Sequence, residues 1–160
     1  MDALFQTQSN ELSTTTQKEK LFKDAERQWN TLSTEKGAPG RKVDFEIYKS
    51  ILYNLEIRKV YLDSKLSLEK FGSIVGTNTT YLSNAVNNYF GCNFKRLINS
   101  YRVVRAKELL DGKDCPVNEL FSRCGFASKS VFYVAFRKVV GMTPLQYISQ
   151  SRNPFMIQRN

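Results

Sequence analysis

Two segments of the chain, residues 79–90 and 128–140, carry polar side chains opposite an apolar stripe, and these side chains are of types that can hydrogen-bond the edges of nucleic-acid bases. In the first, the apolar residues form one helical stripe, and the opposite side carries uncharged polar groups: Asn78, Thr79, Thr80, Ser83, Asn84 and Asn87. In the second, the outward residues are Lys129, Ser130, Tyr133 and Arg137. An asparagine amide can pair with adenine, hydroxyl groups bond several base edges, and a lysine can reach guanine. These residue types are able to bond base edges, and a helix surface that only faces solvent is the alternative.

The composition argues against catalysis and against a bound metal or cofactor. The 160-residue chain contains no histidine, and it has neither a glycine-rich phosphate loop nor a nucleophile paired with a base. Its three cysteines, Cys92, Cys115 and Cys124, lack CxxC spacing, and a zinc site would need carboxylates to complete it. We therefore expect no enzyme activity, no cofactor and no metal, with Cys124 filling a hydrophobic core as a reduced thiol.

The two polar segments belong to an internal repeat. Residues 68–76 (LEKFGSIVG) are echoed by residues 117–125 (VNELFSRCG), and each stretch is followed by a short turn and an apolar-striped helix that closes on a glycine. The turn after Gly125 is one residue longer than the turn after Gly76. Helix, glycine turn and helix form the pattern of a helix-turn-helix, whose second helix enters the major groove of DNA.

Periodicity elsewhere predicts further helices and no sheet. Apolar residues recur at helical spacing over residues 17–32, 44–62 and 94–111, caps and glycines bound shorter helices at 67–76 and 116–125, and a last helix begins after Pro144. We expect an all-α fold: two helix-turn-helix subdomains joined by a long central helix, with an extra N-terminal helical segment.

The expected division into domains follows the turn signals. Residues 1–42 are expected to be a partly disordered linker segment with a short amphipathic helix, because residues 1–15 are polar and Gly37-Ala38-Pro39-Gly40 breaks the pattern. Residues 43–150 are expected to form the double helix-turn-helix domain, and residues 151–160 a flexible tail.

Positive charge is concentrated in the part of the chain that contains the repeat. Residues 63–150 carry twelve Lys or Arg against six Asp or Glu, a net of +6 within the +9 formal charge of the chain. A basic domain favours a polyanion because neutralised phosphates release counterions; a surface that only maintains solubility is the alternative. No apolar run reaches the roughly 20 residues that cross a bilayer, so we expect a cytoplasmic protein with no membrane contact from this segment.

Several short strings resemble the C-terminal DNA-binding domain of AraC/XylS-type transcription regulators. They are Tyr81-Leu82-Ser83, Phe90-Gly91, Ala106-Lys107-Glu108-Leu109-Leu110, Gly125-Phe126, Phe136-Arg137-Lys138 and Gly141-Met142-Thr143-Pro144, with Tyr147 after them. The resemblance covers about residues 45–149 and implies seven helices that recognise adjacent major-groove segments. Two positions depart from it: Gly72 and Phe121 stand where the family usually has a small residue such as alanine. Glycine at position 72 is expected to cost the helix about 1 kcal/mol relative to alanine.

The resemblance also implies roles for individual residues. Base-facing positions of the family match Thr80, Ser83, Asn84, Lys129, Ser130 and Tyr133, together with Val134. Phosphate contacts are expected from Thr79, Asn87, Lys95, Arg96, Ser128, Arg137 and Thr143, because helix starts and basic side chains favour anions. Arg102 matches a recurrent arginine that ties the subdomains together. Since Val134 can make only apolar contact, the second helix is expected to add more affinity than sequence choice.

These patterns predict a sequence-specific transcription regulator that binds double-stranded promoter DNA through residues 79–90 and 128–140. A nonspecific architectural DNA-binding protein and a helical protein-interaction module are the alternatives, and preference among duplexes distinguishes them. Family members usually carry a sensing or dimerisation domain before this module, so we expect a part of a longer regulator rather than a small stand-alone protein. Such a domain and RNA polymerase are its expected partners besides DNA.

Overall fold

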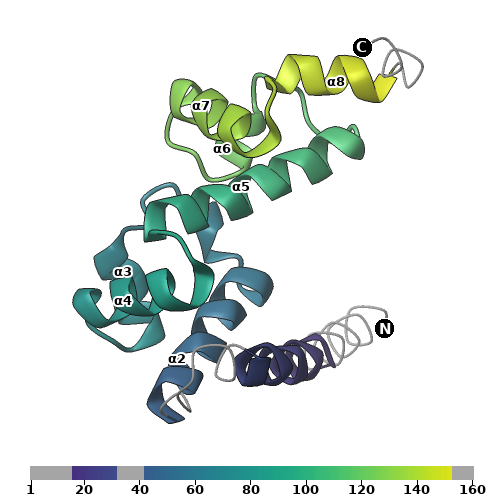
Figure 1. The fold of residues 1–160 in the computed structure, drawn as a ribbon. Helices are drawn as coiled ribbons and strands as arrows, with labels where there is room; N and C mark the ends of the chain where they lie inside the picture. The colour runs from purple at the N-terminus through teal and green to yellow at the C-terminus, as the bar shows by residue number, and fades with distance from the viewer. Residues whose placement is uncertain (1–15, 32–41, 153–160) are drawn as a thin grey trace, which may run out of the picture. The chain divides into compact units, whose positions relative to one another are not determined.

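A computed structural model describes residues 16–31 and 42–152, and within these ranges it contains helices and no strand (Figure 1). The all-α fold class is therefore confirmed. The chain forms two compact units: unit 1 comprises residues up to Val60 and Ser67–Cys92, and unit 2 comprises Tyr61–Leu66 and the residues from Asn93 onward. No helix in the described ranges is long and apolar enough to cross a membrane.

Three expectations fall wholly or partly outside the described residues. The polar stretch 1–15, the linker at 37–40 and residues 153–160 of the expected tail are not among them. The tail was expected to begin at residue 151, but the last helix, α8, spans Pro144–Arg152. The helix α8 thus includes residues 151 and 152 of the expected tail.

Unit 1 contains a helix over residues 16–31, as the apolar stripe predicts, followed by α2 (Lys42–Leu52), α3 (Leu68–Val75) and α4 (Thr79–Phe90). Local hydrogen bonds fix where α3 and α4 begin. The Ser67 hydroxyl accepts from the Lys70 N–H at 3.1 Å, and the Asn78 side chain accepts from the Tyr81 N–H at 2.8 Å. Each cap satisfies a backbone donor that would otherwise lack a partner at the start of the helix.

The helix expected over residues 44–62 is wrong in its second half. After Leu52 the chain continues as a π-helical turn, Tyr53–Ile57, and a separate 3-10 turn covers Val60–Leu62. The Asn54 side chain donates to the Ser50 carbonyl at 2.8 Å, which is the acceptor that an α-helix would give to the Asn54 N–H. The Arg58 N–H instead bonds the Tyr53 carbonyl at 3.1 Å, and Lys59 follows with a φ of 51°.

Gly72 of α3 lies close to the turn that leads into α4. A Cβ added there would lie 2.9 Å from the carbonyl oxygen of Thr77 and 3.8 Å from the Leu82 side chain. The Gly72 carbonyl also accepts the N–H groups of Gly76 and Thr77, at 2.8 Å and 2.9 Å. Alanine was expected to be more favourable here because of its higher helix propensity. That expectation is wrong, because its methyl group would press on the backbone of the turn, which cannot shift without disturbing these hydrogen bonds.

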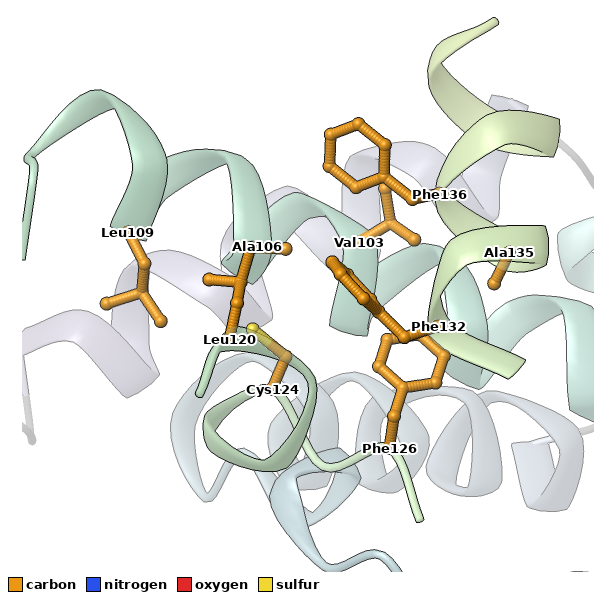
Figure 2. Packing of buried hydrophobic residues seen from close by; sticks show 9 residues of the cluster. All are labelled: Val103, Ala106, Leu109, Leu120, Cys124, Phe126, Phe132, Ala135 and Phe136. Atoms are coloured by element: carbon orange, nitrogen blue, oxygen red, sulfur yellow. The ribbon is translucent and has the colours of Figure 1, made fainter. Parts of the chain in front are cut away.

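Unit 2 is built from α5 (Phe94–Asp111), α6 (Leu120–Arg123), α7 (Lys129–Val140) and α8. Figure 2 shows how residues from α5, α6 and α7 and the turn between the last two meet in one buried cluster: Val103, Ala106, Leu109, Leu120, Cys124, Phe126, Phe132, Ala135 and Phe136. The ring centroid of Phe132 lies 5.3 Å from that of Phe126 and 5.7 Å from that of Phe136. Phe121, which stands where the family usually has a small residue, is half-buried against the cluster.

The helix expected from Pro116 to Gly125 is also shorter than predicted. Residues 117–119 form a turn, and α6 covers only Leu120–Arg123. The Glu119 N–H bonds the Pro116 carbonyl at 3.1 Å, a three-residue spacing typical of 3-10 turns. At the start of α6, Glu119 makes no side-chain cap hydrogen bond.

Arg102 on α5 holds residues 61–66 within unit 2. Its Nε donates to the Tyr61 carbonyl at 2.7 Å, and a terminal nitrogen donates to the Asp63 carbonyl at 2.9 Å. The guanidinium carbon also lies 5.5 Å from the centroid of the Phe126 ring. Burial lowers the pKa of Arg102 because it removes water from the charged group. The two hydrogen bonds and the ring contact replace interactions with that water.

The turn after α6 gives a first prediction. Gly125 has a φ of +87°, and a Cβ there would press on the Tyr61 carbonyl oxygen and lie 2.8 Å from the Leu62 Cα. Gly141 has a φ of +83° and nothing within 4 Å, so it is the matched control. We expect Gly141→Ala to lower the free energy of unfolding by about 1 kcal/mol, and Gly125→Ala by a further 1–3 kcal/mol, roughly the cost of overpacking. Urea unfolding measures both, and equal losses would contradict the close approach.

The buried thiol gives a second prediction. Burial raises the pKa of Cys124 to about 12, with a smaller contribution from Cys115, whereas Cys92 and Cys115 are half-buried. Since the thiolate is the reactive form, only about one in ten thousand Cys124 side chains is reactive at pH 8. Iodoacetamide should therefore modify Cys92 and Cys115 in the folded protein and Cys124 only after unfolding. Mass spectrometry of the peptides decides, and labelling of Cys124 at the rate of Cys92 would disprove its protection.

Candidate nucleic-acid interface

The first candidate reading helix, α4, presents an uncharged polar face. Leu82, Ala85 and Val86 are buried, and α4 contacts α3. Of the residues on α4 that are expected to contact DNA, Thr80, Asn84 and Asn87 are exposed. Thr79 and Ser83 are half-buried. A row of short amide and hydroxyl groups on one side of a buried stripe can form hydrogen bonds with base edges.

The second candidate reading helix, α7, has the same construction with charged groups. The Ser128 hydroxyl accepts from the Val131 N–H at 3.3 Å at its start, and Phe132, Ala135 and Phe136 are buried. Among the residues expected to contact DNA here, Lys129, Ser130 and Arg137 are exposed. Ser128 and Tyr133 are half-buried.

Tyr133 is supported on two sides. Its ring lies edge-on to Phe132, with centroids 5.6 Å apart, and the Lys129 Nζ lies 5.8 Å from its centroid. The ring therefore packs partly on the core of unit 2. This support limits the orientations of the tyrosine and places its ring beside the Lys129 ammonium group.

A basic cleft lies between the start of α5 and the second half of α7. It has a volume of about 690 Å³ and is lined by Asn93, Lys95, Arg96, Asn99, Ser100, Ala135, Lys138 and Val139. No carboxylate lines it. The side chains of Lys95, Arg96 and Lys138 are exposed and form no ion pair with any carboxylate of the described part of the chain. Three cations from two helices can therefore meet a phosphate group without first giving up a protein partner.

The helix starts expected to bind phosphate are already capped in part. Asn93 accepts from the Arg96 N–H at 2.9 Å. Thr143 and Gln146 form a reciprocal pair: the Thr143 N–H donates to the Gln146 Oε1 at 2.9 Å, and the Thr143 hydroxyl accepts from the Gln146 N–H at 3.3 Å. Phosphate contact by Thr143 stays a prediction, and it depends on N–H groups other than its own.

The structure groups the expected contact residues by unit. Thr79, Thr80, Ser83, Asn84 and Asn87 share α4, and the other eight lie in unit 2, where only Lys95 and Arg96 line the basic cleft. Sequence reasoning missed Lys138 and Asn99 as members of this cleft. The adjacent Arg137-Lys138 pair in the last turn of α7 was the available signal, but the meeting of α7 with α5 is a tertiary contact.

Comparison with known proteins decides the family. Residues 72–150 match the helix-turn-helix domain family. The HTH-type transcriptional activator RhaR of Enterobacter sp. (strain 638) is 31% identical over 91 residues, which cover 57% of this chain and 32% of that protein. The C-terminal domain of AraT, a response regulator from Geobacillus stearothermophilus, superposes with a TM-score of 0.58 at 28% identity, covering 66% of this chain and 84% of that one. The chain belongs to the AraC/XylS-type regulators.

The AraC/XylS-type fold also agrees with a structure solved on DNA. The DNA-binding domain of AdpA, a global transcriptional factor in complex with a target DNA, superposes with a TM-score of 0.59 at 20% identity, covering 69% of this chain and 97% of that one. The chain spans between 14% and 40% of the length of the curated relatives it matches. It therefore corresponds to the helix-turn-helix part of these regulators.

The cleft of this AraC/XylS-type domain gives a third prediction. Lys95→Ala should weaken binding to every DNA duplex and reduce the slope of log affinity against log salt by about one unit, because one fewer phosphate is neutralised. Lys65→Ala, which removes the same charge from an exposed position outside the cleft, should change the slope by less than about half a unit. Binding titrations between 50 and 300 mM salt measure both. A change in sequence preference would contradict the assigned role of Lys95.

Proposed function

We propose that the chain is the sequence-reading part of a longer transcription regulator, with α4 and α7 entering successive major-groove segments of promoter DNA. The observation that carries the proposal is the pair of helices with matching caps, each with a buried stripe and a polar outer face. On α4, Thr80, Ser83 and Asn84 contact bases, and on α7, Lys129, Ser130 and Tyr133 do so. The remaining expected contacts, Thr79, Asn87, Lys95, Arg96, Ser128, Arg137 and Thr143, hold the phosphates.

This proposal gives the two helices different weights. The outer face of α4 has no charge, so its contacts discriminate between bases without much salt dependence. The outer face of α7 carries Lys129 and Arg137 and exposes Val134 at 58% of its surface, so it contributes more to affinity. RNA polymerase and a sensing or dimerisation domain are the further partners that the family implies, and the cytoplasm is the compartment in which promoter DNA is reached.

The test is selection of bound duplexes from a random DNA pool at about 150 mM salt, followed by sequencing. Two short motifs with centres about 10 bp apart, one helical turn, support two readers in one chain. A single motif would mean that only one of the helices reads bases. No enrichment over the starting pool would refute sequence-specific regulation and favour an architectural role.

Asn84 gives a fourth prediction. Its exposed amide lies one turn after Thr80 on the polar face of α4, and an asparagine can bond adenine N6 and N7 together. Asn84→Ala should relax preference at one base pair of the selected site and cost about 1–3 kcal/mol of binding free energy there. Titrations against single-base variants of the site measure this. An equal loss of binding free energy on all duplexes would mean that Asn84 contacts the DNA backbone and not a base.

A further inference from the structure

The helix over residues 16–31 precedes the region that matches the helix-turn-helix family, residues 72–150. It is amphipathic and belongs to unit 1. Ala25 and Trp29 are only 1% and 7% exposed, and they form a buried cluster with Tyr48 and Leu52 of α2. A helix outside the matched region is thus docked on unit 1 through Ala25 and Trp29.

The docking surface includes the end of α4. The Trp29 ring lies 4.7 Å from the ring of Tyr89, centroid to centroid, and 5.7 Å from that of Tyr48. Tyr48 in turn lies 5.5 Å from Phe90, and its hydroxyl donates to the Gln28 Oε1 at 2.8 Å. Tyr89 and Phe90 are the last two residues of α4. The N-terminal helix therefore contacts the candidate reading helix both directly and through α2.

The end of α4 depends on this cluster for its position. The fully buried anchors of α4, Leu82 and Val86, lie in its first two turns. Toward its end, Tyr89 is held by the Trp29 ring and by the Asp44 carboxylate, which bonds its hydroxyl. Hydrogen bonds to bases need donor and acceptor within about 2.7–3.2 Å. A small tilt of α4 is therefore enough to break contacts made by Asn84.

We propose that the helix over residues 16–31 sets the orientation of α4, with Trp29 as the positioning residue, so that this helix controls reading of the α4 half-site and leaves reading by α7 unchanged. The inference rests on the proposed function. Any force that undocks Trp29 releases the end of α4. A structural change on the N-terminal side of the module therefore alters, through this helix, which DNA sequence is preferred.

The decisive measurement is a pair of discrimination ratios for the full chain. The first is the affinity for the selected duplex divided by the affinity for a duplex with the α4 half-site scrambled, and the second is the same ratio for the α7 half-site. Trp29→Ala should lower the first ratio about tenfold and change the second less than twofold. Partial unfolding lowers the active fraction on all duplexes alike and cancels in both ratios, so it cannot imitate this result.

Two variants serve as controls. Trp29→Phe keeps an aromatic ring against Tyr89 and should restore most of the first ratio. Glu26→Ala changes an exposed residue of the same helix and should leave both ratios as in the wild type. If Trp29→Ala leaves the first ratio unchanged, or lowers both ratios equally, the positioning role is wrong.

Hydrogen exchange of the DNA-free protein separates this inference from the proposed function. Trp29→Ala should speed amide exchange over residues 87–90 at least tenfold relative to the wild type, with exchange over residues 137–140 unchanged. If the wild type prefers no sequence but this difference appears, the proposed function fails and Trp29 still orders α4. If exchange over residues 87–90 does not change, Trp29 does not position α4, whatever the DNA results.

Discussion

The guanidinium of Arg102 determines how unit 2 closes. It donates to the carbonyls of Tyr61 and Asp63 and packs on Phe126. Hydrogen bonds from a charged donor contribute about 1.5–3 kcal/mol each, and without the arginine these carbonyls would lose partners. Because Gly125 packs against the same stretch of backbone, Arg102 and Gly125 together fix the turn between α6 and α7. The helix α7 begins three residues after Phe126, so its start is set by contacts that lie far away in the sequence.

Unit 1 fixes its reading helix by a different means. At Gly72, α3 lies so close to the turn before α4 that a single added carbon would press on the Thr77 carbonyl oxygen, which fixes the turn that leads into α4. At the other end, aromatic rings from the N-terminal helix and α2 surround Tyr89 and Phe90. Aromatic pairs contribute about 0.5–1.5 kcal/mol beyond the area that they bury. The two units share a repeat in sequence, and each has a glycine at a close backbone contact and packed aromatic rings, but unit 2 adds the buried charge of Arg102.

Local signals predicted most of the fold, and tertiary contacts account for the rest. The helices over residues 79–90 and 94–111 were predictable with their observed bounds, because caps such as Asn78 and apolar stripes lie within or next to the segments themselves. The break after Leu52 was not, since Asn54 bonding the Ser50 carbonyl is one of several conformations its side chain allows. The candidate site followed the same rule: the polar faces were readable, but the cleft with Lys138 arises only where α5 and α7 meet.

Under the proposed function, discrimination and affinity are divided between the units by side-chain type. Asn, Ser and Thr on α4 are short, so fixing them against a base costs little conformational entropy, whereas ordering a lysine costs roughly 2 kcal/mol. Short uncharged groups therefore suit base reading, and the cations Lys95, Arg96 and Lys138 suit diffuse attraction to phosphate. Because the helix over residues 16–31 docks on unit 1, an input delivered through it acts on discrimination. It then changes which site is chosen more than how strongly DNA in general is held.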